Sequence, residues 1–137
     1  MDFPGLELKI RMTLVAGPDM RVFVPVRLYY MDTDPYAVQF SFDVTPDDVV
    51  RWTFARELLD QGLTAPAGIG DVKITPVGPL HDRGLRLELE SPDGYACLEG
   101  PAAPIKEWIA ETYAAVAAGQ ESKAVDIDSL LDDLLTH

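Results

Sequence analysis

Hydrophobic and polar residues alternate at the start of the chain. Between residues 6 and 14 every second residue is apolar, and the residues between them are charged or polar. Alternation with a period of two is typical of a half-buried β-strand. Similar segments follow, separated by turns rich in Gly, Pro and Asp, and predict strands over residues 6–14, 20–30, 36–42 and 49–54. Pro25 cannot donate to a strand ladder, so we expect a sheet edge or a bulge there.

The second half of the chain repeats this order of elements. A short helix over 55–61, closed by Gly62 as a C-terminal cap, follows the fourth strand directly. After a loop with Pro and Gly, alternation resumes and predicts strands over 71–77, 84–90 and 95–99, the last two joined by a Ser91-Pro92-Asp93-Gly94 hairpin turn. Apolar residues at three- and four-residue steps predict a helix over 101–118, which Gly119 ends.

These elements define an α+β fold, because runs of antiparallel strands are followed by helices. The order is ββββα-βββα-α, with a core over about residues 6–118 and a last helix over about 127–136. A chain of 137 residues matches one domain, so we expect a single domain over residues 1–137 with two antiparallel β-sheets.

Charge narrows the range of partners. The formal net charge is −12, from 23 acidic and 11 basic residues, and the bases are scattered along the sequence. Proteins that bind nucleic acid neutralise phosphates with Lys and Arg, and anionic membranes attract the same residues. An acidic chain is repelled by both, so we expect neither nucleic-acid binding nor membrane insertion, and the partner it permits is another protein.

The composition also indicates where the protein resides. Cys97 is the only cysteine, so no internal disulfide can form, which suits a reducing cytoplasm. The N-terminal residues show neither the basic nor the apolar region of a secretory signal, and no apolar stretch approaches the length of a membrane span. We therefore expect a cytoplasmic protein.

No catalytic, cofactor-binding or metal-binding residue is predicted. His81 and His137 belong to no ligand cluster, and Cys97 lacks an electropositive setting that would lower its pKa. Gly68-Ile69-Gly70 precedes a strand, whereas nucleotide loops lie between a strand and a helix, so a turn with positive φ explains it better. The aspartates between 126 and 133 do not follow the spacing of a calcium loop. We expect no enzyme activity and no cofactor.

Aromatic and leucine side chains are the candidate contacts to partners or to other copies of the chain. Aromatic residues are frequent at interface hot spots, yet a stripe at helical spacing more often packs into its own core. A terminal helix of under three turns is marginal alone and is expected to dock on its own domain or on another subunit. The candidates are Tyr36, Trp52, Trp108, Leu130, Leu131, Leu134 and Leu135.

Several blocks together resemble a known family. They are Asp34-Pro35-Tyr36-Ala37-Val38, Arg51-Trp52-Thr53-Phe54-Ala55-Arg56-Glu57-Leu58-Leu59, Gly62-Leu63, Pro66-Ala67-Gly68-Ile69-Gly70-Asp71-Val72, Leu89-Glu90-Ser91-Pro92-Asp93-Gly94 and Val125-Asp126-Ile127-Asp128. In order and spacing they are similar to the SsgA-like sporulation and cell-division proteins of filamentous, spore-forming bacteria. The resemblance covers nearly the whole chain, with Thr53 where a Val or similar residue is frequent.

The resemblance implies a function without catalysis. It implies a regulator of septum positioning during sporulation. For the SsgB-like branch it implies a protein that helps recruit FtsZ. It also implies a whirly-like fold and a homotrimer. The first hypothesis is therefore a septum-site adaptor that binds itself and cell-division proteins such as FtsZ. The alternative, single-stranded nucleic-acid binding, depends on fold analogy, and Arg51, Arg56, Lys73 and Arg86 are its candidate phosphate contacts.

Overall fold

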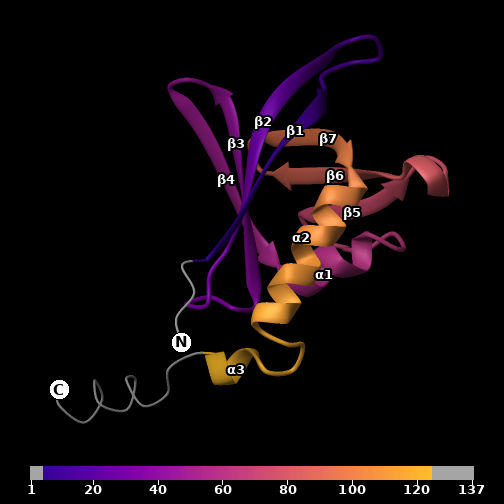
Figure 1. Cartoon of the computed structure of the whole chain (residues 1–137). Helices are drawn as coiled ribbons and strands as arrows, with labels where there is room; N and C mark the ends of the chain where they lie inside the picture. The colour runs from indigo at the N-terminus through magenta and orange to yellow at the C-terminus, as the bar shows by residue number, and fades with distance from the viewer. Residues whose placement is uncertain (1–4, 125–137) are drawn as a thin grey trace.

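The structure is a computed structural model and describes residues 5–124 (Figure 1). The strands are β1 (Leu6–Val15), β2 (Arg21–Tyr30), β3 (Ala37–Thr45), β4 (Asp48–Ala55), β5 (Val72–Val77), β6 (Gly84–Ser91) and β7 (Gly94–Pro101). The α-helices are α1 (Arg56–Gly62), α2 (Ala102–Ala115) and α3 (Glu121–Ala124), and a short 3₁₀ helix, η1, spans Leu80–Asp82. The helix predicted over 127–136 lies outside the described residues.

The strands form one curled antiparallel sheet in the order β4-β3-β2-β1-β7-β6-β5. Its two halves, β1–β4 and β5–β7, are joined through β1 and β7 by two residue pairs, Thr13 with Glu99 and Leu14 with Leu98. The halves run in clearly different directions in Figure 1, so the two sheets expected from the sequence are the two halves of one continuous sheet, joined where β1 pairs with β7. The α+β class is confirmed.

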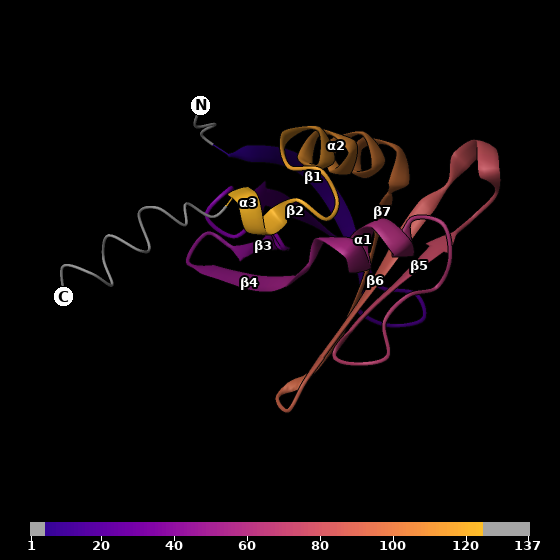
Figure 2. The ribbon, with the colours of Figure 1, turned by 90° about the horizontal axis from the view of Figure 1, so that it is seen from below.

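The hydrophobic core lies where the helices pack into the bend between the two halves (Figure 2). Alternation along β2 directs Val24, Val26 and Leu28 inward, and each is at most 4% exposed. The apolar stripe of α2 is buried with them, as its spacing predicts. α2 lies against β1 and β6, whereas α1 lies against β5 and β4. Each helix thus contacts both halves of the sheet.

Gly62 has a packing role instead of the predicted capping role. α1 continues through Gly62, and Leu63, with right-handed helical φ and ψ of −71° and −22°, is the C-cap. A Cβ on Gly62 would clash with Cγ2 of Ile74 on β5. The absence of a side chain therefore lets α1 approach β5 closely, and this close approach, not chain reversal, is what requires glycine here.

Two expectations for the first half need correction. β2 is an interior strand, so Pro25 is not on an edge strand; its partner on β1 is Arg11, and the pairing of β2 with β3 begins one residue later, at Val26. Proline is tolerated because β3 has diverged from β2 at that point. Tyr36 belongs to the turn before β3, not to the strand face, and its side chain is 56% exposed.

Candidate functional site

Arg56 is a buried arginine that connects α1, the end of α2 and α3, at the lower end of the molecule in Figure 1. β4 runs directly into α1, and the backbone N–H of Arg56 donates a hydrogen bond of 2.8 Å to the carbonyl of Tyr36. A cation in the first turn of a helix is unfavourable next to the positive end of the helix dipole. The Arg56 side chain instead leaves α1 and extends under the end of α2, where it is 1% exposed.

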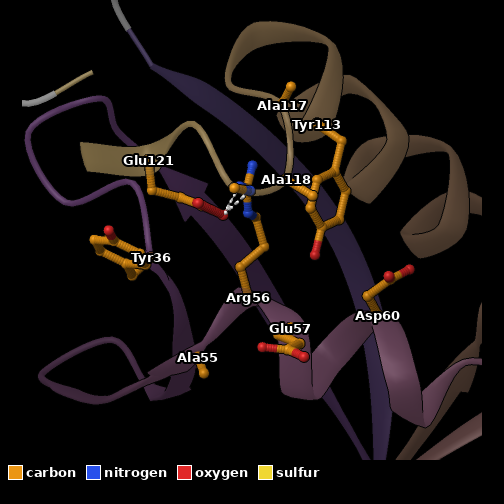
Figure 3. A pocket seen from close by; sticks show the side chains of 10 residues that line it. Tyr36, Ala55, Arg56, Glu57, Asp60, Tyr113, Ala117, Ala118 and Glu121 are labelled. Carbon is orange, nitrogen blue, oxygen red and sulfur yellow. Dashed lines mark hydrogen bonds and ion pairs between the residues drawn. The ribbon is translucent and has the colours of Figure 1, made fainter. Parts of the chain in front are cut away.

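The guanidinium of Arg56 satisfies the C-terminal end of α2 (Figure 3). Its Nη1 donates to the carbonyl oxygens of Thr112 and Val116, at 3.0 and 2.8 Å. Its Nη2 donates to Oε1 of Glu121 at 3.0 Å. The carbonyl of Thr112 also accepts from the backbone N–H of Val116 at 2.9 Å. The carbonyls at the end of a helix carry partial negative charge, so a cation here serves as a tertiary C-cap.

Two tyrosine rings lie next to the same guanidinium. Cζ of Arg56 is 4.0 Å from the ring centroid of Tyr113 and 5.0 Å from that of Tyr30, within the range of cation–π attraction. Burial raises the pKa of both tyrosine hydroxyls, and the nearby positive charge opposes part of that increase. Both rings therefore stay neutral and supply apolar packing around the buried cation.

Glu121 provides the compensating negative charge. Its pKa is lowered by the hydrogen bond from its own backbone N–H, by the Gly119 N–H that donates to Oε1 at 3.3 Å, and by Arg56. The carboxylate form is thus favoured, and α3 is connected to both α1 and α2 through one ion pair. A buried arginine without such a partner would be strongly unfavourable.

A groove of about 820 Å³ lies beside this network. Glu57 and Asp60 of α1 line one wall, and the exposed ring of Tyr36 stands across from them (Figure 3). Ala117 and Ala118 leave the groove open because their side chains are small. Exposed carboxylates beside an aromatic ring suit a partner segment that carries Lys or Arg next to an apolar side chain.

The groove contains one of the predicted contact residues, Tyr36. Trp52 pairs with Phe40 on the inner face of the edge strand β4 and is half-buried against the core. Trp108 is 3% exposed, so its side chain packs in the core and is not available as a surface contact of the chain. The four candidate leucines at 130, 131, 134 and 135 lie outside the described residues.

The basic residues are arranged differently from the sequence-based expectation. The four proposed phosphate contacts form no common groove, because Arg56 is buried, Arg86 pairs with Glu99 at 3.0 Å, and Arg51 and Lys73 lie on opposite edge strands. The bases are nevertheless not scattered in space. Strand register aligns Lys9, Arg27, Ser41 and Arg51 in one row across β1–β4.

Reactive side chains form no cluster within residues 5–124, and no group of three His, Cys, Asp or Glu there could hold a metal ion. Burial raises the pKa of the half-buried Cys97 thiol, so the thiolate is disfavoured. Gly68 has a φ of +94°, as the turn interpretation of this loop requires. In the same part of the chain, no helix is long and apolar enough to cross a membrane.

The curled seven-stranded sheet, with helices in its bend, is the architecture of the SsgA-like proteins. The chain belongs to the SsgA family, because the family model described as "Streptomyces sporulation and cell division protein, SsgA" matches residues 24–121. Two curated relatives are named sporulation-specific cell division protein SsgB. The one from Streptomyces coelicolor is 38% identical over 96% of each chain, and the one from Thermobifida fusca is 42% identical, also over 96% of each.

Solved structures agree with this assignment. The crystal structure of an SsgA-like sporulation-specific cell division protein from Thermobifida fusca matches with a TM-score of 0.84 and 36% identity, over 97% of this chain and 98% of that one. A structure from work on SsgB mutations and longitudinal cell division in Streptomyces coelicolor matches with a TM-score of 0.82 and 35% identity, over 88% and 94%. The solved structures therefore have the same fold as this chain, and their descriptions name the same role in cell division as those of the curated relatives.

Proposed function

We propose that this chain is a non-enzymatic adaptor for septum-site positioning, which associates with itself and helps recruit or control FtsZ. The proposal rests on its relatives. They match nearly the whole chain, and all three are named sporulation-specific cell division proteins. Within residues 5–124 no group of three His, Cys, Asp or Glu could hold a metal ion, and burial raises the pKa of the Cys97 thiol. Surface grooves are therefore the candidate sites of action.

The groove beside Arg56 is the surface that suits a protein partner best. Its walls come from α1, the end of α2 and the β2–β3 turn. The Arg56 side chain joins α1 to the end of α2, and the Arg56 backbone N–H is bonded to the carbonyl of Tyr36 in the turn. A rigid surface loses little conformational entropy on binding. Tyr36 is an exposed aromatic residue within it, and aromatic residues are frequent among the few side chains that dominate binding energy.

Binding to purified FtsZ tests the recruitment part of the proposal. Full-length chain and FtsZ are measured by biolayer interferometry, with Tyr36→Ala as the test variant and Tyr95→Ala as the matched control. Tyr95 is similarly exposed, at 62% against 56% for Tyr36, but lies at the far β6–β7 hairpin. We expect Tyr36→Ala to weaken binding by about tenfold to thirtyfold and the control to leave it unchanged. No binding of the wild-type chain contradicts FtsZ recruitment.

Light scattering at several protein concentrations tests self-association. The proposal expects a molar mass above that of the monomer, which is 15.1 kDa, at the higher concentrations. A monomer throughout would remove self-association from the proposed function and leave the FtsZ measurement unaffected.

A further inference from the structure

One face of the sheet carries the opposite charge to the chain as a whole. The side chains of β1–β4 that point away from the core include five of the chain's 11 basic residues and two carboxylates. The whole chain has 23 acidic residues, so this face is a local reversal of sign. The cations are Lys9, Arg11, Arg21, Arg27 and Arg51, and the carboxylates are Glu7 and Asp43.

The centre of this face is the row of Lys9, Arg27, Ser41 and Arg51. Neighbouring strands are about 4.8 Å apart, so the row spans about 15 Å. The Nε of Arg27 and the Oγ of Ser41 are buried and have no hydrogen-bond partner among the described residues. Arg51 forms no ion pair with any residue between 5 and 124. Arg27 pairs with Asp43 at 3.2 Å, whereas Lys9 lies 4.0 Å from Glu7 and its side chain is 77% exposed. The exposed side chains of Lys9 and Arg51 therefore offer positive charge to an anionic ligand.

An apolar groove continues from the row. It forms where β3 diverges from β2 beside Pro25, and it has a volume of about 660 Å³. Lys9, Arg27 and Asp43 line it together with apolar or uncharged residues from β1, β2 and the β3–β4 hairpin, namely Ile10, Pro25, Val26, Val44, Thr45, Pro46 and Val49. A ligand for this face needs both carboxylates and apolar side chains.

We infer that this groove binds the C-terminal segment, residues 125–137, of a second copy of the chain. That segment contains four aspartates, four leucines and neither Lys nor Arg, so its charge and its apolar side chains complement the row and the groove. The inference rests on the self-association in the proposed function, and it identifies the two surfaces that meet.

The path of the chain favours a second copy over the chain's own segment. The described residues end at α3, near the β2–β3 turn, whereas the groove lies at the β3–β4 turn at the other end of the strands (Figure 1). A nine-residue strand such as β3 spans about 30 Å, and the groove lies on the face opposite the helices. Asp126 and Leu130 are two and six residues beyond α3, a reach of about 7 and 20 Å at about 3.3 Å per residue, so they fall short of the groove of their own chain.

Charge exchange between full-length chains tests the inference. The groove variant is Lys9→Glu/Arg51→Glu, the segment variant is Asp126→Lys/Asp128→Lys, and analytical ultracentrifugation measures association. We expect each variant alone to associate at least about tenfold more weakly than wild type, and the equimolar mixture to recover association. Lys73→Glu/Lys106→Glu makes the same change in net charge at exposed sites away from the groove, and it is expected to associate as wild type does.

Several outcomes would overturn the inference. If wild type self-associates but the mixture does not recover association, or if deleting residues 125–137 leaves association unchanged, another surface joins the copies and the proposed function still stands. If the groove variant associates normally but loses binding to a fluorescent dT20 oligonucleotide, the row is a nucleic-acid surface instead. A wild-type monomer at all concentrations would remove this inference together with the self-association that it rests on, while FtsZ binding remains separately measurable.

Discussion

Replacing Arg56 by methionine tests whether the buried ion network stabilises the fold. Methionine has a similar length and fills most of the same space, so the cavity left behind is small. The change removes the donor to two carbonyls at the end of α2 and the partner of Glu121. Breaking a buried ion pair costs about 3–5 kcal/mol, and we expect the free energy of unfolding to fall by about that amount.

Urea unfolding followed by circular dichroism measures this effect. With a slope of about 2 kcal/mol per molar urea, the midpoint is expected to fall by about 1.5–2.5 M. Arg56→Lys keeps the charge but lacks the planar guanidinium that donates to three acceptors. Its midpoint should therefore lie between those of wild type and Arg56→Met. Lys73→Met is the matched control, because Lys73 is exposed on β5, and a change below about 0.5 kcal/mol is expected. An Arg56→Met midpoint equal to that of wild type would refute the capping role.

Two further substitutions test the packing and the electrostatics. Gly62→Ala places a methyl group against the isoleucine side chain of β5, and thermal or urea unfolding should show a loss of about 1–3 kcal/mol, whereas Gly70→Ala, with open space around it, should be neutral. The pKa of Glu99 is lowered, first by its hydrogen bond from Arg21. Its stabilising effect is therefore complete above the unfolded pKa of about 4.3 and is lost as the pH falls through the lower folded value. Wild type should be more stable than Glu99→Gln at pH 6, and the difference should shrink as the pH falls below about 4.3, so an equal difference at pH 6 and pH 3 would contradict this.

The strands were predictable because their signal is local. Alternation along β1, β2 and β6 requires only that one face is buried, and the Ser91–Gly94 turn joins β6 and β7 as the sequence indicates. The helix α2 followed from the same kind of argument at a different period. Gly62 was misinterpreted because a glycine at the end of a helix is usually a cap, and its contact with β5 is not visible from neighbouring residues.

The two surfaces could not be predicted because they depend on long-range register. Lys9, Arg27 and Arg51 are far apart in the sequence and become neighbours only through the pairing of four strands. Arg56 did carry one signal that the sequence analysis missed. A basic residue in the first turn of a helix opposes the helix dipole, so its charge has to be compensated elsewhere in the fold.

The joint between β1 and β7 has a consequence for how this fold can vary. Only two residue pairs join β1 and β7 in register, and the side chains of α1 and α2 that occupy the bend help to set the angle between the two halves. A change of volume at a buried position such as Ile105 would then alter the curvature of the opposite, solvent-facing side without replacing any residue there. Relatives that share the same surface residues but differ in core volume can therefore place those residues at different distances and angles from one another.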